Sequence, residues 1–173
     1  MFLSAAAIER AMADRRITIT PFDPARLGAA SYTFGVGDEV FEVAPERTDT
    51  GYTFAPRPAP LQNGAWLLAP GRLYLAATQE RMGSAHFAMR LVGRPGLGHI
   101  GLFLQVSADL GHQGALHAWT LEIVATNPTR LHPGQLIGQI GFCRTAGPAR
   151  PYEGDFGASD RPMMSSLHGR RAL

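Results

Sequence analysis

The sequence Gly93-Arg-Pro-Gly-Leu-Gly-His-Ile-Gly-Leu102 forms a glycine-rich turn that leaves much of its backbone accessible. Further along the chain, Glu122 stands inside the apolar run Ala118-Trp-Thr-Leu-Glu-Ile-Val124. An ionised carboxylate is rarely buried unless something compensates its charge. Glu122 therefore either faces water at a sheet edge, paired with an Arg, or is held in place for chemistry.

Short alternating segments precede and follow this turn, as is typical of β-strands. The 20 Gly and 13 Pro separate these segments without a fixed period. The pattern predicts a mostly β protein, either a sandwich or a distorted barrel. A short N-terminal helix, capped by Ser4, would turn Ile8, Ala11 and Met12 to one side. The strands are expected at residues 17–20, 31–36, 40–43, 66–68, 73–78, 88–92, 100–106, 118–124 and 136–142.

Two segments lack this regular pattern. Residues 44–64 are rich in Pro, Thr and Gly, with little periodicity beyond Tyr52-Thr-Phe54, and we expect a long excursion or flap there. Residues from about 144 to 173 contain several Gly and Pro and are expected to form an extended arm. Gly37-Asp38 is a turn signal that should end the strand before it. The whole chain, 1–173, is expected to be a single domain.

Composition excludes several classes of function. All 16 residues counted as Lys or Arg are Arg, so neither a P-loop lysine nor a Schiff-base amine is present. The net charge is only +2 and the Arg residues are scattered, so no nucleic-acid partner is expected. A single cysteine, Cys143, precludes an internal disulfide and a Cys-based zinc cluster. There is no signal-peptide pattern and no 18-residue apolar run, so we expect a cytoplasmic protein with no membrane contact.

Taken in order along the chain, the segments resemble the bacterial dCTP deaminase family, within the superfamily shared with dUTPase. The matching segments are Ala30-Ser-Tyr-Thr-Phe-Gly-Val-Gly37, Gly93-Arg94 with Gly101-Leu102, Val106-Ser-Ala108, Leu121-Glu122, Leu131-His-Pro-Gly134, and Gly147-Pro148 with Arg150-Pro-Tyr152. The resemblance implies a dUTPase-like (β-clip, jelly-roll-like) distorted barrel and a homotrimer with active sites between subunits. It also implies deamination of dCTP, or a related pyrimidine deoxynucleotide, to dUTP and ammonia. Zinc would not be needed, Mg²⁺ would arrive with the triphosphate, and the C-terminal arm of a neighbour would close over it.

The resemblance also assigns roles to residues. Glu122 aligns with the catalytic glutamate of the family, which takes a proton from the attacking water and returns it. The residues expected to bind the nucleotide are Arg94, Gly96, His99, Ala108, Asp109, His112 and Tyr152.

Several positions depart from the family pattern and weaken the expected phosphate contacts. Pro95-Gly96 replaces two serines, and Pro95 has no N–H to donate. His99 and Leu110 replace arginines, and His112 replaces an aspartate. Each lost charge-assisted contact costs about 1.5–3 kcal/mol. The candidates to replace the lost cations are His99, His112 and His117, and Asp109 with His112 is a candidate acid–base pair near Glu122.

Two other functions remain open at this point. One is a degenerate homologue that binds a nucleotide or a protein without turnover. The other is a dUTPase-like pyrophosphatase, for which Asp109 is the only acidic residue in the relevant turn. His112, His117 and Asp109 could in principle bind zinc, but the zinc-deaminase signature cannot be met with one cysteine, so no metal ligand is assigned.

Overall fold

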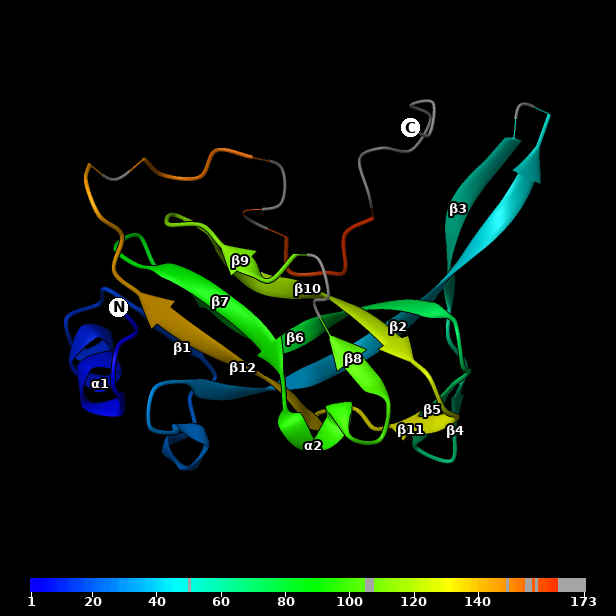
Figure 1. Cartoon of the computed structure of the whole chain (residues 1–173), viewed down its shortest axis with the longest axis horizontal. Coiled ribbons are helices and arrows are strands. Elements are labelled where there is room, and N and C mark those ends of the chain that lie inside the picture. The colour runs from blue at the N-terminus through cyan, green and yellow to red at the C-terminus, as the bar shows by residue number, and fades with distance from the viewer. Residues whose placement is uncertain (50, 105–107, 149, 155–156, 158, 165–173) are drawn as a thin grey trace.

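A nine-stranded sheet curls into a half-barrel and forms the body of the protein (Figure 1). The structure is a computed structural model that describes residues 1–49, 51–104, 108–148, 150–154, 157 and 159–164. Its strands are β1 (Thr18–Thr20), β2 (Tyr32–Thr48), β3 (Gly51–Pro58), β4 (Leu61–Gln62), β5 (Ala65–Leu68), β6 (Leu73–Gly83), β7 (Ala88–Gly93), β8 (Leu102–Leu104), β9 (Leu110–Gly111), β10 (Leu116–Ala125), β11 (Thr129–Leu131) and β12 (Leu136–Cys143). Its helices are α1 (Ala5–Ala13), a 3₁₀ turn (Pro24–Arg26) and α2 (Pro95–Gly98). The predicted mostly β, distorted barrel with a short N-terminal helix is confirmed.

The order of the strands brings the two ends of the large sheet close together. That order is β8-β10-β6-β2-β12-β7-β9, and β4, β5 and β11 form a separate small sheet. At the end of β7, a Cβ placed on Gly93 would lie 3.7 Å from the Cβ of Leu104 in β8. The half-barrel therefore nearly closes where β7 meets β8.

Alternation along the strands gives the half-barrel an apolar interior. Tyr32, Phe34 and Val36 of β2 are fully buried, as are Leu121 and Ile123 of β10. Because successive strand residues point to opposite faces, the residues between them lie on the outer face.

Helix α1 begins directly after Ser4, as predicted, although the Ser4 side chain makes no capping hydrogen bond. Ile8 and Ala11 are buried against the core, and Met12 packs against it partly exposed. The segment before the helix is held by a hydrogen bond from the Leu3 N–H to the Phe142 carbonyl, 2.8 Å long. In the described part of the chain, no helix is long and apolar enough to cross a bilayer.

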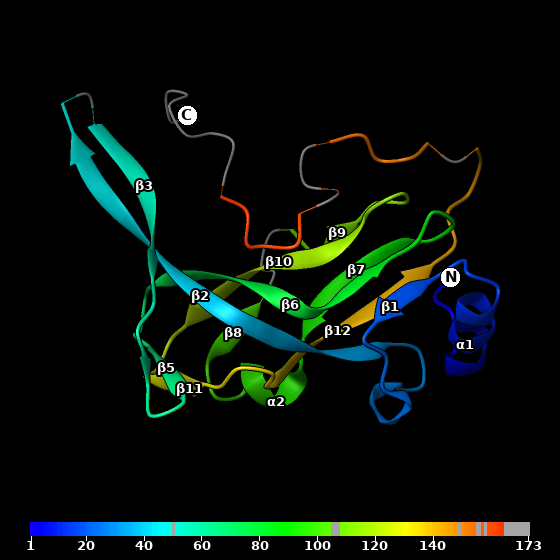
Figure 2. The ribbon, with the colours of Figure 1, turned by 180° about the vertical axis from the view of Figure 1, so that it is seen from behind.

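Residues 44–64 are more regular than their sequence indicated. Strand β2 continues to Thr48 and pairs with β3 in an unbroken antiparallel register, from Phe41 opposite Pro58 to Thr48 opposite Gly51. Together they form a two-stranded ribbon that projects from the barrel (Figures 1 and 2). Prolines concealed the alternation in the sequence, since they are read as loop residues.

Gly37-Asp38 does not end a strand, contrary to the sequence prediction. Strand β2 passes through it, and the register against β6 shifts between Val36 and Val40. Gly37-Asp38 therefore forms an irregularity inside a long strand. Such an irregularity bends the strand without interrupting it. Strand β8 begins at Leu102, two residues later than expected, and residues 105 and 106 of the predicted strand lie outside the described residues.

One carboxylate, Glu80 of β6, is fully buried in this fold. Arg26 Nη1 donates a hydrogen bond to Glu80 Oε1 over 2.7 Å, and the Gly35 N–H donates to Oε2 over 3.1 Å. Burial raises the pKa of Glu80, and the hydrogen bonds from Gly35 and Arg26 oppose that shift. Glu80 therefore ties the 3₁₀ turn and the bulged strand β2 to β6.

We expect Glu80→Ala to lower the free energy of unfolding by about 2–4 kcal/mol, because it leaves the buried Gly35 N–H without an acceptor and removes the shorter of the ion pairs that Arg26 makes with Glu80 and Asp23. Glu46→Ala is the matched control, since Glu46 forms an exposed ion pair with Arg57. That control should cost no more than about 1 kcal/mol. Urea unfolding measures both, and equal losses would contradict a structural role for Glu80.

Candidate active site

Glu122 lies on the outer face of the half-barrel. Its neighbours Leu121 and Ile123 point inward and are fully buried, and Glu122 itself is partly buried on the opposite side, the side of Thr120 and Val124. Ile123 has a partner on each side, Tyr74 in β6 and Leu104 in β8. Glu122 is therefore not in an edge strand, which removes one of the two explanations offered by the sequence.

The glycine-rich turn contains the short helix α2, which the sequence did not predict. Arg94 precedes this helix, and its N–H donates to the Ile137 carbonyl over 3.1 Å. A Cβ on Gly96 would meet no atom within 4 Å, so a ligand can approach the backbone there. His99 ends the turn and is exposed.

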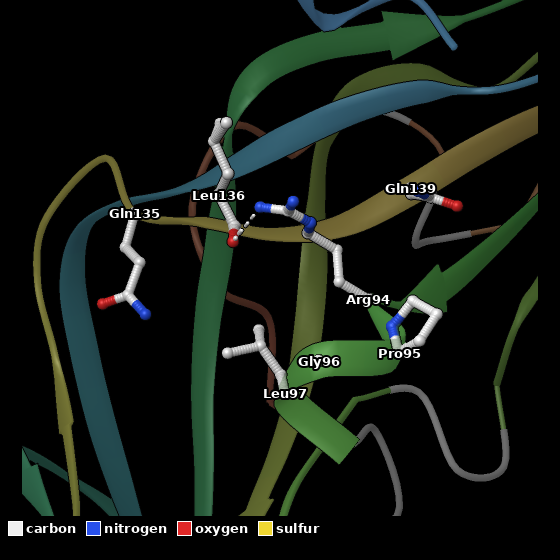
Figure 3. Close-up of a pocket in the computed structure, with 7 residues that line it drawn as sticks. All are labelled: Arg94, Pro95, Gly96, Leu97, Gln135, Leu136 and Gln139. Atoms are coloured by element: carbon white, nitrogen blue, oxygen red, sulfur yellow. Dashed lines mark hydrogen bonds between the residues drawn. The ribbon is translucent and has the colours of Figure 1, made fainter. Parts of the chain in front are cut away.

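A hollow of about 600 Å³ adjoins this turn (Figure 3). The Arg94 guanidinium reaches across it to the Leu136 carbonyl, 3.4 Å from Nη1, and the amide side chains of Gln135 and Gln139 lie on either side. The hollow is lined by Arg94, Pro95, Gly96, Leu97, Gln135, Leu136 and Gln139. A guanidinium, two amides and open backbone are suited to an anionic ligand. Sequence reasoning missed the two glutamines.

The turn and Glu122 come from adjacent parts of the barrel. Gly93 lies against Leu104, and Leu104 is the strand partner of Ile123. β8 is paired with β10, and the end of β7 lies against the other side of β8 without pairing to it in the described part of the chain. Arg94 and Glu122 therefore flank the same strand, β8.

The other residues predicted to bind the nucleotide form a second group. Asp109 accepts a hydrogen bond from Arg90 Nε at 2.6 Å, and its carbonyl is bound by the Leu91 N–H. The rings of His112 and Tyr152 stack with their centroids 5.2 Å apart. Leu91 is three residues before Arg94, about 10 Å along a strand. The expected Asp109–His112 pair is thus replaced by contacts that each residue makes with another partner.

Ala108 is exposed and follows directly after residues 105–107, which the structure does not describe. Within the described residues, no group of three or more His, Cys, Asp or Glu side chains is arranged to hold a metal ion.

The C-terminal arm returns to the face that carries Glu122. Arg161 binds Glu39 of β2 through two hydrogen bonds, of 2.7 and 3.1 Å. Asp160 pairs with Arg81 of β6 at 2.9 Å. The Met163 N–H donates to Thr120 Oγ1, 3.0 Å away, two residues before Glu122. Within one chain, therefore, the arm lies across its own strand β10. The expectation that a neighbour's arm closes over the nucleotide stays a prediction.

His117 is not the exposed cation that the sequence suggested. It is buried, its ring lies 4.2 Å from the Trp119 ring, and Nδ1 is 2.9 Å from the Ala118 carbonyl. Its Nε2 is buried with no hydrogen-bond partner among the described residues. Burial lowers the pKa of His117, although the Ala118 carbonyl and the Asp160 carboxylate oppose part of the shift. A neutral, buried ring is poorly suited to binding phosphate.

The chain is similar in sequence to known proteins of one kind. A family model described as dCTP deaminase-like matches residues 2–145. A Rhodopirellula baltica protein named dCTP deaminase is 35% identical over 131 residues, 76% of this chain and 66% of that protein. The chain thus spans slightly less than two thirds of this relative. A Cytophaga hutchinsonii protein named "dCTP deaminase, dUMP-forming" is 32% identical over 151 residues, 87% of each chain.

The fold has a counterpart among solved structures. The crystal structure of 2'-deoxycytidine 5'-triphosphate deaminase from Agrobacterium tumefaciens superimposes with a TM-score of 0.61. The match covers 82% of this chain and 47% of that chain, at 17% sequence identity. At that identity, the likeness concerns the fold alone.

We expect the stability of the protein to fall as the pH drops below about 6.5, the ordinary pKa of histidine, partly because of His117. The unfolded chain takes up a proton on His117 at that pH, while the folded chain resists it because the pKa is lowered. The stability that the neutral His117 ring contributes is present at neutral pH. It is lost on acidification, by at most about 1.4 kcal/mol per pH unit. Urea unfolding midpoints, determined at roughly half-unit steps between pH 5 and pH 8, measure this loss of stability.

His117→Phe should flatten this profile, since it keeps the contact with Trp119 and cannot be protonated. His99→Gln, a change in an exposed residue, should leave the profile as in the wild type. A His117→Phe variant as acid-sensitive as the wild type would show that other groups cause the loss.

Proposed function

The chain belongs to the dCTP deaminase-like family, and on that premise we propose that it hydrolyses dCTP to dUTP and ammonia, with Glu122 as the general base. The observation that carries the proposal is the position of Glu122. It is a partly buried carboxylate in a strand with partners on both sides, and strand β8 lies between that strand and the end of β7 that leads into Arg94. Partial burial of an ionised carboxylate costs free energy, and a role in catalysis would explain why Glu122 occupies this position.

The reaction replaces the exocyclic amine of cytosine with oxygen. Water adds to C4, and Glu122 accepts the proton that the water gives up. Glu122 then returns this proton to the departing nitrogen as the C4–N bond breaks, and the hydroxyl proton of the adduct moves to ring N3, so that ammonia leaves and a C4 carbonyl remains. The balance is one dCTP and one water giving one dUTP and one ammonia, and no redox partner is needed.

The triphosphate would occupy the hollow at the glycine-rich turn. Arg94 is the charged residue among those that line it, and Gly96 lets the backbone approach closely. Mg²⁺ would neutralise part of the phosphate charge. The amide oxygens of Gln135 and Gln139 are acceptable partners for its water shell, and no carboxylate lines the hollow. These residues fit a Mg²⁺ ion held mainly by the nucleotide.

We further propose that the site is completed by a neighbouring copy in a homotrimer. Glu122 and the turn at Arg94 both lie on outer surfaces of the half-barrel, where another subunit can cover them. Asp109, His112 and Tyr152 form a separate group in one chain, and a neighbour's copy of this group can reach the hollow.

A second candidate is formation of dUMP and pyrophosphate in the same site. It is favoured by the Cytophaga hutchinsonii relative, whose name specifies dUMP formation and which aligns with 87% of this chain. That reaction needs a second water activated near the α-phosphate. Asp109, the acid considered for this role, is engaged by Arg90.

Glu122→Gln should lower the rate of ammonia release from dCTP with Mg²⁺ by about 100- to 10,000-fold, the usual contribution of a general acid–base group. Glu46→Gln, in an exposed ion pair far along the ribbon, is the matched control and should be fully active. Enzymatic detection of ammonia gives the rate, and anion-exchange chromatography separates dUTP from dUMP. If the wild type does not convert dCTP but melts at a higher temperature in its presence, the protein binds the nucleotide without catalysing a reaction.

Arg94→Gln should raise KM for dCTP by about 10- to 150-fold, because it removes a charge-assisted contact worth about 1.5–3 kcal/mol. Arg130→Gln, an exposed arginine in β11, is the control and should keep the wild-type KM. Steady-state kinetics at saturating Mg²⁺ measures both. An unchanged KM in Arg94→Gln would show that the phosphates do not bind in this hollow.

A further inference from the structure

The ribbon formed by β2 and β3 has one apolar face. Directly opposed residues share a face, and successive pairs alternate between faces. One face carries Phe41, Val43, Pro45, Tyr52, Phe54 and Pro56, with Arg47 at its tip. The other carries Glu42, Glu46, Thr53 and Arg57, where Arg57 and Glu46 form an ion pair. The ribbon therefore has one apolar and one polar face, as does a pair of strands that covers a hydrophobic core.

Among the described residues, the apolar face covers no core. Tyr52 is 71% exposed and Phe54 is 52% exposed. The pairing of β2 with β6 ends at Val43, so the outer part of the ribbon extends beyond the barrel (Figure 2). Contiguous exposed apolar surface of this kind usually marks a contact site. A two-stranded hairpin is also only marginally stable alone in water.

The edges of the ribbon are less suited to contact than its face. Pro45 lies in β2, and Pro56 and Pro58 lie in β3. Proline has no N–H, so each one removes a donor that a docking strand would need. Addition of a further strand is therefore disfavoured, and the apolar face is the remaining contact surface.

We propose that this face packs against the same face of a second copy of the chain, across a two-fold axis. The same apolar face on two copies can pair across a two-fold axis, and such an isologous contact closes without leaving a free copy of the surface. Two such ribbons can pack face to face about 10 Å apart, as the layers of a sandwich do. The charged face with Glu42, Glu46 and Arg57 stays in water.

The area is sufficient for a weak, specific dimer. An aromatic side chain buries about 150–250 Å². With the prolines and Val43 included, each ribbon would contribute on the order of 500 Å², or about 1,000 Å² in total, near the lower limit for specific interfaces. The contact should therefore form only at higher protein concentration. It should double the number of chains in whatever assembly the barrels form. It does not depend on the proposed catalytic activity.

Sedimentation equilibrium from about 1 to 200 μM tests the contact, a range suited to weak interfaces of this size. The mass of the wild type should double across the range. The double variant Tyr52→Ser/Phe54→Ser should stay at the lower mass, with the melting temperature of the barrel unchanged. Ala55→Ser, on the opposite face of the same strand, should double as the wild type does. No doubling in the wild type, or doubling that persists in the double variant, would overturn the proposal.

A cysteine at the middle of the face tests its geometry. In a Cys143→Ala background, Phe54→Cys should give a disulfide-linked dimer under mild oxidation, because Phe54 lies near the two-fold axis. Ala55→Cys, which points to the other face, should not. If mass doubling depends on Tyr52 and Phe54 but Phe54→Cys does not cross-link, the ribbon docks on another surface and the face-to-face arrangement is wrong.

Discussion

The register of β10 against β6 is the constraint on which the rest of the structure depends. Leu121 and Ile123 point into the core only because Leu121 stands opposite Ala76 and Ile123 opposite Tyr74. A slip of one residue would exchange the two faces and bury Glu122 in the apolar interior. The irregularity between Ala118 and Thr120 sets this phase, since His117 and Ala118 are both buried immediately before it. The placement of the acid is thus a consequence of how the core is filled.

Close packing of glycines brings the glycine-rich turn to the same region. Gly138 of β12 stands opposite Gly93 of β7, and a Cβ on Gly138 would collide with the Phe34 ring. The absence of a side chain lets Phe34 fill the core directly beneath β12. The next residue after Gly93, Arg94, is then anchored through its backbone to Ile137. The turn is positioned by the barrel wall and not by its own sequence.

Sequence reasoning predicted the parts of the molecule that depend on local alternation. It placed β6, β7, β10 and β12 within a few residues, and the roles that it assigned to Glu122 and Arg94 stay predictions. It missed what depends on partners distant in the chain. Glu80 meets Arg26, Asp160 meets Arg81, and Arg161 meets Glu39, and no spacing in the sequence indicates these pairs. His117 was misjudged for the same reason, because its burial comes from packing and from the returning arm.

The way the arm is attached makes its position over strands β2, β6 and β10 sensitive to salt. Its two ion pairs, Arg161–Glu39 and Arg81–Asp160, are largely exposed, in contrast to the buried Glu80 contact. Exposed charges are screened over about 8 Å at physiological ionic strength and over shorter distances in brine. Raising the salt concentration therefore loosens the arm while the barrel keeps its shape. The outer face of β10 is then more covered in dilute buffer and more open in concentrated electrolyte.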